Sequence, residues 1–277
     1  MPAIVVTSRA NPRVKQLRAA FVGNARLSGG LVAIEGEHLL QEALRSGLPI
    51  KTIFLSERID PPAWLPRTVE LLYLADEAFS SAVNTQHPQG IAALLIPPRW
   101  EVDSALAAIT RNPPPLVLIA ESLQDPGNLG TLIRSAEAFG VTAVLTTPGT
   151  VSEWNQKALR ASAGSVFRVP VIAATHADIA ALKSRGLHLF AAVAGAGEKA
   201  VPIATANLNQ PCALMIGNEG AGLSPDLLAL ADARITIPMP GRVESLNAAI
   251  AGSLLLYEAA RQRAASQLTT DNSQLFL

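Results

Sequence analysis

The sequence predicts an α/β protein in which a small N-terminal α/β unit precedes a larger C-terminal domain built on a mostly parallel sheet. From Leu116 onward, continuous apolar segments of strand length alternate with helical segments, a pattern typical of a parallel sheet covered on both faces. Shorter elements alternate before residue 97, and Pro113, Pro114 and Pro115 form a stiff spacer. We therefore expect a first domain at 1–97, a linker at 98–115, a second domain at 116–267 and a flexible tail at 268–277.

Composition excludes several classes of protein. Hydrophobic residues make up 49% of the 277 residues, yet no uncharged apolar run reaches the roughly 18 residues of a membrane span. The N-terminus lacks the charged-then-apolar order of a secretory signal. A single cysteine, Cys212, excludes an internal disulfide and fits a reducing compartment, so we expect a cytoplasmic protein. The four histidines lack metal-ligand spacing, and we expect no metal site.

The N-terminal unit is predicted to alternate helices and strands. Helices are expected at 11–21, 37–46 and 76–83, and strands at 31–34, 51–56 and 91–96. The net charge is zero, but residues 1–34 contain no acid and five basic side chains: Arg9, Arg13, Lys15, Arg18 and Arg26. This basic arm could contact nucleic-acid phosphates, and a merely solvated basic face explains it equally well.

The C-terminal domain is predicted to hold six strands and five helices after a weak helix at 100–115. The strands are expected at 116–120, 142–147, 168–172, 188–194, 213–216 and 234–237. Helices are expected at 129–139, 155–163 and 177–185, after Ser224, and at 246–263. Ser224 precedes Pro225 and Asp226, which is a strong signal for a helix start.

The helix at 246–263 is the element around which the domain is organised. Its first residues are apolar nearly all round, so we expect protein to enclose it. The chain reaches it through the Pro- and Gly-containing loop 237–245, and Ser245 is a favourable capping residue. The free N–H groups and the positive end of the helix dipole would then face whatever this loop binds.

Two further segments follow predicted strands and carry polar side chains. In QDPGNLGTLIRSAEAFG (124–140), Asn128 lies in a turn and Arg134 lies within an apolar helix, where a guanidinium needs an anionic partner. In LMIGNEGAGLS (214–224), the glycines allow close backbone approach to a ligand. Their order differs from dinucleotide and P-loop motifs, and Glu219 would repel a pyrophosphate. Glu219 suits a cationic or hydroxyl-bearing ligand, or Arg134.

A third segment, IPMPGRVESLN (237–247), places Ser245 and Asn247 at the start of the last helix. Each of these side chains could cap the helix or hold a ligand. Together the three segments resemble the motifs of the SpoU (TrmH) class of the SPOUT superfamily, the S-adenosylmethionine-dependent RNA ribose 2′-O-methyltransferases. KALRASAGSVFRVP (157–170) is also similar to that class, whereas Ala248 and Ala249 depart from the Val-Ser that members often carry. The first hundred residues more loosely resemble a ribosomal-protein-like substrate-binding domain.

The resemblance implies a deep trefoil knot in the C-terminal domain and an obligate homodimer. It implies that S-adenosylmethionine is held by backbone groups at Gly217, Ile237 and Leu246. It also implies a catalytic set composed of Asn128, Arg134, Glu219, Ser245 and Asn247. An arginine stays protonated and is a poor general base. We therefore expect Arg134 to grip a phosphate and the emerging oxyanion, oriented by Glu219.

The substrate is expected to be RNA, and ribosomal RNA more than tRNA, because this type of N-terminal domain accompanies ribosomal targets in much of the family. Two other readings stay open. The α/β pattern would also suit a nicotinamide-dependent oxidoreductase, although the glycine order disfavours it. A non-catalytic RNA-binding module on the same scaffold is the other alternative.

Overall fold

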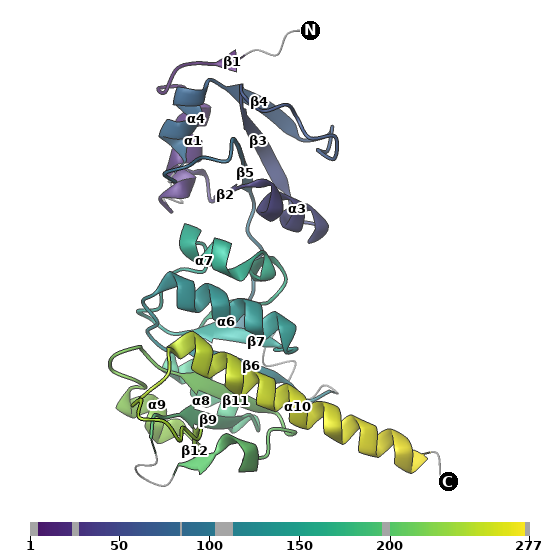
Figure 1. The fold of residues 1–277 in the computed structure, drawn as a ribbon, viewed down its shortest axis with the longest axis vertical. Coiled ribbons are helices and arrows are strands. Elements are labelled where there is room, and N and C mark those ends of the chain that lie inside the picture. The colour runs from purple at the N-terminus through teal and green to yellow at the C-terminus, as the bar shows by residue number, and fades with distance from the viewer. Residues whose placement is uncertain (1–4, 24–27, 84, 103–112, 196–199, 275–277) are drawn as a thin grey trace. The chain divides into compact units, whose positions relative to one another are not determined.

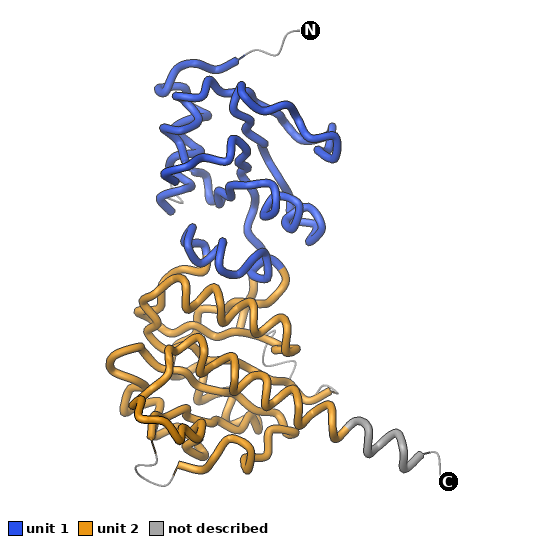
Figure 2. Tube along the Cα trace, in the orientation of Figure 1, with its two compact units in different colours: residues 1–99, 154–167 blue, residues 100–153, 168–277 orange. Residues whose placement is uncertain are grey.

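The structure is a computed structural model that describes residues 5–23, 28–83, 85–102, 113–195 and 200–274, the last eight of these in backbone only. The chain divides into two compact units (Figure 2). Unit 1 comprises residues 1–99 and 154–167, and unit 2 comprises residues 100–153 and 168–277. Most of the expected linker, and of the weak helix at 100–115, lies outside the described residues.

Unit 1 contains a five-stranded mixed sheet in the order β1-β4-β3-β5-β2. Strands β1, β4 and β3 are parallel, and β5 runs antiparallel to both β3 and β2. The strands are β1 (Val5–Val6), β2 (Val32–Glu35), β3 (Ile50–Ser56), β4 (Glu70–Leu74) and β5 (Ile91–Leu95). Its first three helices are α1 (Pro12–Phe21), α3 (Glu37–Arg45) and α4 (Asp76–Ala82).

A segment from the C-terminal half of the chain completes unit 1. It contains α7 (Gln156–Ser162) and the short 3-10 helix η1 (Ser165–Phe167). The buried Gln156 side chain donates a hydrogen bond to the Ala33 carbonyl of β2, at 2.9 Å. A Cβ on Gly164 would lie 2.7 Å from the Glu42 Cβ of α3, so this contact requires a glycine. Segment 154–167 therefore packs with elements more than a hundred residues away in sequence.

Unit 2 contains a seven-stranded sheet in which every pairing is parallel, in the order β10-β12-β9-β11-β6-β7-β8. The first three strands are β6 (Leu116–Ala120), β7 (Ala143–Thr146) and β8 (Val171–Ala173). The next four are β9 (His188–Ala192), β10 (Val201–Pro202), β11 (Cys212–Ile216) and β12 (Ala233–Thr236). Its helices are α6 (Pro126–Ala138), α8 (His176–Ser184), α9 (Pro225–Leu230), α10 (Ala248–Gln274) and the 3-10 helix η2 (Ile203–Thr205).

Helices cover both faces of this sheet (Figure 1). Alternate side chains of β6 and β11, including Ile119 and Met215, form a core with Ile179 of α8 and Leu227 of α9. The intervening residues of β6 and β11 face the other side of the sheet, because successive side chains of a strand point to opposite faces. There α6 and α10 pack closely: a Cβ on Gly252 would lie 2.4 Å from Leu132 Cδ2 and 3.4 Å from Ile216. The expected α/β fold with a parallel sheet is confirmed.

Several elements differ from the predictions. The strands β1, β4 and β10 were not predicted, since two of them have only two residues and β4 begins with an acid. Helix α10 begins two residues later than expected and continues to Gln274, into the region expected to be a tail; residues 275–277 lie outside the described part. The start of α10 is not enclosed on every side: Ile250 and Tyr257 are each 54% exposed, whereas Leu255 and Leu256 are buried.

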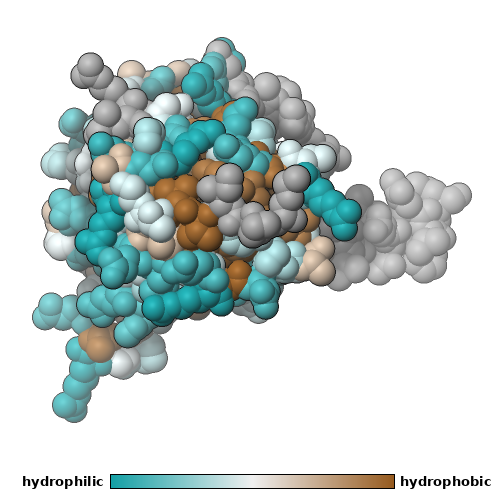
Figure 3. Space-filling view, turned by 90° about the horizontal axis from the view of Figure 1, so that it is seen from above, coloured by the Kyte–Doolittle hydropathy of each residue, from teal (hydrophilic) through white to brown (hydrophobic). Residues whose placement is uncertain are grey.

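The face drawn in Figure 3 is largely hydrophilic, with hydrophobic residues mainly near its centre and a few elsewhere. Among the described residues, no helix has the length and apolar character needed to cross a membrane. The same residues hold no group of three or more histidine, cysteine or acidic side chains that could bind a metal ion.

Candidate active site

A cavity of about 430 Å³ opens in unit 2 at the carboxyl ends of β9, β11 and β12. Ligands bind α/β proteins at this end of a parallel sheet, and the volume lies in the range of about 300–1,000 Å³ that is usual for small-molecule sites. The residues around it are Ala192, Val193, Ala194, Ile216, Gly217, Asn218, Glu219, Gly220, Gly222, Ile235, Thr236, Ile237, Met239, Ser245, Leu246, Asn247, Ala248, Ala251 and Leu255.

One wall of the cavity is the glycine-rich loop that follows β11. Its backbone closes on itself, because the N–H of Asn218 donates to the Gly222 carbonyl at 2.9 Å and the reverse bond has the same length. A Cβ on Gly217 would lie 2.1 Å from the carbonyl carbon of Gly222, so no larger residue fits there. The Asn218 side chain accepts from the N–H groups of Gly220 and Ala221. The loop is thus a tight, internally bonded turn.

Three polar side chains from three separate segments form a hydrogen-bonded chain at this site. The Asn247 amide donates to the Asn128 Oδ1 at 3.0 Å, and the Asn128 amide donates to the Glu219 Oε1 at 2.9 Å. Glu219 also accepts longer bonds from the N–H groups of Gln124 and Asp125. Burial opposes ionisation of Glu219, but these hydrogen bonds together hold its pKa below the ordinary value. The site therefore contains a carboxylate that stays charged at neutral pH.

The N-terminal caps of α6 and α10 fix the backbone at two further positions of the site. Asp125 caps α6 by accepting from the Asn128 N–H at 2.9 Å, and Pro126 occupies the first turn. Asn247 caps α10 by accepting from the N–H groups of Ala249 and Ile250. Ser245, expected as a capping residue, instead lines the cavity. The cap lies two residues further on because α10 begins at Ala248.

The cavity brings most of the predicted residues together. It is lined by all three predicted cofactor-binding residues and three of the predicted catalytic ones: Gly217, Ile237, Leu246, Glu219, Ser245 and Asn247. Asn128 joins them through its hydrogen bonds to Glu219 and Asn247.

Arg134 is the exception. It does not line the cavity, and Glu219 bonds Asn128 where we expected it to orient Arg134. The sequence predicts an anionic partner for Arg134, yet its side chain is exposed and makes no hydrogen bond or ion pair with any residue the structure describes. Its position on the outer side of α6 explains this difference.

Two parts of the site were not predicted from the sequence. The end of β9, at 192–194, carries only small apolar side chains, so no motif marked it. Its place between β11 and β12 in the sheet is what brings it to the cavity. Asn218 was also missed, although it lies within the glycine-rich segment.

The chemistry of the walls indicates the class of ligand. Apolar side chains and backbone groups form most of the surface, Glu219 is acidic, and no lysine or arginine lines the cavity within the described residues. A pyrophosphate would find no cationic partner there, which argues against the nicotinamide-dependent alternative. The parallel sheet and this cavity together define an α/β binding site for a small, largely organic ligand, and Glu219 disfavours a ligand with negative charge at that point.

Comparison with known proteins identifies the family. The model of the SpoU rRNA Methylase family matches residues 115–257, and that of the MRM3-like substrate binding domain matches residues 11–93. The 23S rRNA (guanosine(2553)-2′-O)-methyltransferase RlmP of Bacillus subtilis is 34% identical, over 91% of this chain and 97% of that protein. Mitochondrial rRNA methyltransferase 3 of Xenopus tropicalis is 32% identical, over 84% of this chain and 70% of that protein.

A solved structure agrees with these matches. The SpoU methyltransferase AviRb from Streptomyces viridochromogenes, in complex with the cofactor AdoMet, superposes with a TM-score of 0.78 at 28% identity. The match covers 92% of this chain and 98% of that one. The chain belongs to the SpoU rRNA methylase family. It is an RNA 2′-O-methyltransferase that uses S-adenosylmethionine, and the resemblance stated from its sequence is confirmed.

Proposed function

We propose that this enzyme methylates a ribose 2′-hydroxyl in ribosomal RNA, with the cavity of unit 2 holding S-adenosylmethionine. The names of the relatives from Bacillus and Xenopus, both ribosomal RNA methyltransferases, support this choice of substrate. The N-terminal match to a substrate-binding domain supports a role for unit 1 in binding the RNA. The single observation that carries the proposal is the cavity, where three separate motifs meet around one carboxylate.

The residues present fit S-adenosylmethionine. When bound, it supplies a methyl group attached to a positively charged sulfonium. Backbone groups at Gly217, Ile237 and Leu246 would hold its polar atoms, and the apolar side chains of Ile216 and Leu255 would pack against its carbon skeleton. The ionised Glu219 keeps the local potential negative, which suits a cationic group.

The polar side chains would align the ribose. A neutral hydroxyl is a poor nucleophile, so the enzyme must hold it in line with the methyl group and stabilise charge as its proton leaves. Asn128 and Asn247 are fixed by their mutual hydrogen bond, and Ser245 and Asn247 both line the cavity. Arg134 would contact the adjacent phosphate and the developing oxyanion, while that phosphate or a water molecule accepts the proton.

Arg134 would reach this site from a second copy of the chain. Ile250, Leu254 and Tyr257 lie four and three residues apart on α10, so they share one helix face, and they are 54%, 43% and 54% exposed. An apolar face of this kind marks a protein interface. It adjoins α6, because Phe139 contacts Tyr257 ring to ring at 5.9 Å and Ser135 bonds Ser253. A homodimer formed through α6 and α10 would bury this face and place Arg134 at the interface.

Three further parts of the proposal rest on family membership. The C-terminal domain would form the deep trefoil knot, with α10 as its last element. The domain boundaries at 97 and 116 would separate RNA binding from catalysis, although segment 154–167 packs in unit 1. The enzyme would work in the cytoplasm.

The basic arm contributes less free charge to RNA binding than its composition indicates. Arg9 pairs with Glu77 at 3.1 Å and Arg13 with Glu70 at 2.9 Å. Arg18 donates to the carbonyl and hydroxyl of Ser81. Lys15 is exposed, and Arg26 lies outside the described residues. We propose Lys15 as the phosphate-contacting residue of this arm.

Transfer of labelled methyl groups to purified ribosomal RNA and to tRNA tests the proposal. The expected result is one 2′-O-methylated nucleotide in ribosomal RNA, identified by its resistance to alkaline cleavage. Labelling of tRNA alone would favour a tRNA methyltransferase. Tight binding of both RNA and S-adenosylhomocysteine without any transfer would favour a non-catalytic RNA-binding module.

A further inference from the structure

The glycine-rich loop is anchored at both ends by the two residues that follow β6. At its start, the Asn218 amide donates to the Ser122 carbonyl at 2.8 Å. At its end, Ser224 bonds the Glu121 carboxylate twice: the N–H donates to Oε2 at 2.7 Å and the hydroxyl donates to Oε1 at 2.6 Å. The cavity-lining residues Glu219, Gly220 and Gly222 lie between these two anchors.

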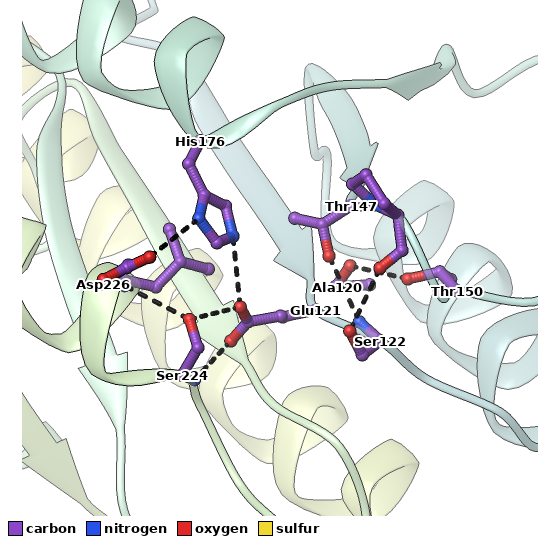
Figure 4. Close-up of polar contacts among 10 residues, drawn as sticks. Ala120, Glu121, Ser122, Thr147, Thr150, His176, Ser224 and Asp226 are labelled. Carbon is purple, nitrogen blue, oxygen red and sulfur yellow. Dashed lines mark hydrogen bonds and ion pairs between the residues drawn. The ribbon is translucent and has the colours of Figure 1, made fainter.

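Glu121 is a buried carboxylate outside the predicted catalytic set. It is 3% exposed and lies between Ser224 and His176 (Figure 4). The His176 Nε2 lies 3.2 Å from the Glu121 Oε1, and its Nδ1 lies 3.9 Å from Asp226. A buried carboxylate is costly unless donors satisfy it, and here Ser224 donates two hydrogen bonds while His176 lies within 3.2 Å.

The backbone of Glu121 and Ser122 is itself held in place by hydrogen bonds. The Glu121 N–H donates to the Ile216 carbonyl at 2.8 Å, and Ser122 adopts a left-handed φ of 51°. Ser122 donates through its N–H to the Thr147 hydroxyl and through its own hydroxyl to the Pro148 carbonyl (Figure 4). A left-handed backbone at a residue other than glycine persists only where its surroundings enforce it.

Capping of α9 does not explain this arrangement. Ser224 caps α9 by accepting from the Leu227 N–H at 3.3 Å, which uses only the lone pairs of its hydroxyl. The hydroxyl proton and the Ser224 N–H are left to bind Glu121. The cap of α9 would form without a buried carboxylate. The bonds from Ser224 to Glu121 instead restrain the end of the glycine-rich loop, as a loop that contacts a ligand requires.

We propose that Glu121 is a positioning residue for methyl transfer. Its carboxylate fixes the end of the glycine-rich loop through Ser224, and the fixed loop presents its cavity-lining backbone to S-adenosylmethionine. His176 holds the carboxylate in this orientation. The proposal rests on the proposed use of the cavity by S-adenosylmethionine.

The test is calorimetric binding of S-adenosylhomocysteine to Glu121→Gln at a temperature where urea and thermal curves show the variant fully folded. The amide replaces one acceptor oxygen by a donor, so it clashes electrostatically with the donors around it. We expect the Kd to rise about tenfold or more, with KM for S-adenosylmethionine rising more than kcat falls. Glu137→Gln is the matched control, because Glu137 pairs with Arg168 away from the cavity, and its Kd should match the wild type.

A second pair of variants decides the matter if Glu121→Gln does not fold. Ser224→Thr keeps the hydroxyl and should bind like the wild type, whereas Ser224→Ala removes one of the bonds to Glu121 and should bind several-fold more weakly. The double variant Glu121→Gln with Ser224→Ala should bind no more weakly than Glu121→Gln, since both changes break the same contact. Wild-type Kd values for folded Glu121→Gln and Ser224→Ala would overturn the proposal. A wild-type protein that binds no S-adenosylhomocysteine would instead overturn the proposed use of the cavity.

Discussion

At the scale of single residues, the site is a chain of three side chains that the sequence keeps far apart. Asn247 bonds Asn128, and Asn128 bonds Glu219, so each amide has one fixed orientation. A fixed amide can direct a ribose hydroxyl only because its own hydrogen bonds prevent it from rotating. Arg134 does not take part in this series of hydrogen bonds. We therefore expect its substitution to affect methyl transfer without affecting cofactor binding.

Arg134→Lys tests the role of the guanidinium. A lysine keeps the charge but loses the planar pair of donors that grips a phosphate. We expect methyl transfer to fall about a hundredfold, while the Kd for S-adenosylhomocysteine, measured by calorimetry, stays unchanged. Near-wild-type transfer would show that the planar contact is not needed.

Glu219 gives a prediction about pH and stability. Its pKa in the folded protein lies below the ordinary value of 4.5, despite the burial that opposes ionisation, because Asn128 and nearby N–H groups bond the carboxylate. Protonation is therefore harder in the folded than in the unfolded state, and the carboxylate contributes stability above that ordinary value. Urea unfolding should show Glu219→Gln less stable than the wild type at neutral pH, with the gap closing as the pH falls below 4.5. A gap that is independent of pH would contradict the assigned hydrogen bonds.

At the scale of elements, the two sides of α10 have different surroundings. One face packs on α6 and β11, where Gly252 allows close contact, and the other presents Ile250, Leu254 and Tyr257 to the outside. The C-terminal half of the helix is held in place by Arg263. Its guanidinium donates hydrogen bonds to the carbonyls of Leu208, Pro114, Pro115 and Gln210. The helix is thus fixed within its own unit and still has an apolar face for a partner.

Leu254→Glu tests whether that face is a dimer interface. A charge placed there would have to be buried on association, at a cost of several kcal/mol. Analytical ultracentrifugation should show the wild type as a dimer and the variant shifted to monomer, with methyl transfer lost. Val22→Glu, at a residue of unit 1 that is 68% exposed, is the matched control and should remain dimeric. A dimeric Leu254→Glu protein would rule out this surface.

At the scale of the whole molecule, we propose that unit 1 binds the RNA and that unit 2 transfers the methyl group. Lys15→Gln should weaken RNA binding and lower the slope of its salt dependence by about one, because one phosphate contact is lost. Arg13→Gln should do less, since Glu70 already pairs with Arg13. Titrations at several salt concentrations measure this, and the Kd for S-adenosylhomocysteine should not change. A change in that Kd would place Lys15 in another role.

The sequence predicted the sheet of unit 2 well because its strands are buried on both faces and read as unbroken apolar runs, as in LVLIA at 116–120. It predicted several of the cavity-lining residues, such as Gly217 and Asn247, because glycines and capping residues follow those strands. Contacts between distant segments left no local signal. The bond from Gln156 to Ala33 and the anchoring of Ser224 by Glu121 join residues about a hundred positions apart. The exposure of Arg134 was not predicted either, because the apolar residues around it in the sequence do not report which side of α6 is left uncovered.

The most direct test of the shared site is subunit mixing between Arg134→Ala and Asn128→Ala. Each variant alone should be inactive in methyl transfer to ribosomal RNA. After subunit exchange, half of the dimers are mixed, and one of the two sites in each mixed dimer has an intact Asn128 and a partner's intact arginine. We predict that activity returns to about a quarter of the wild-type value. Activity that stays at the background of the two variants, although mass spectrometry shows mixed dimers, would contradict a site built from both copies.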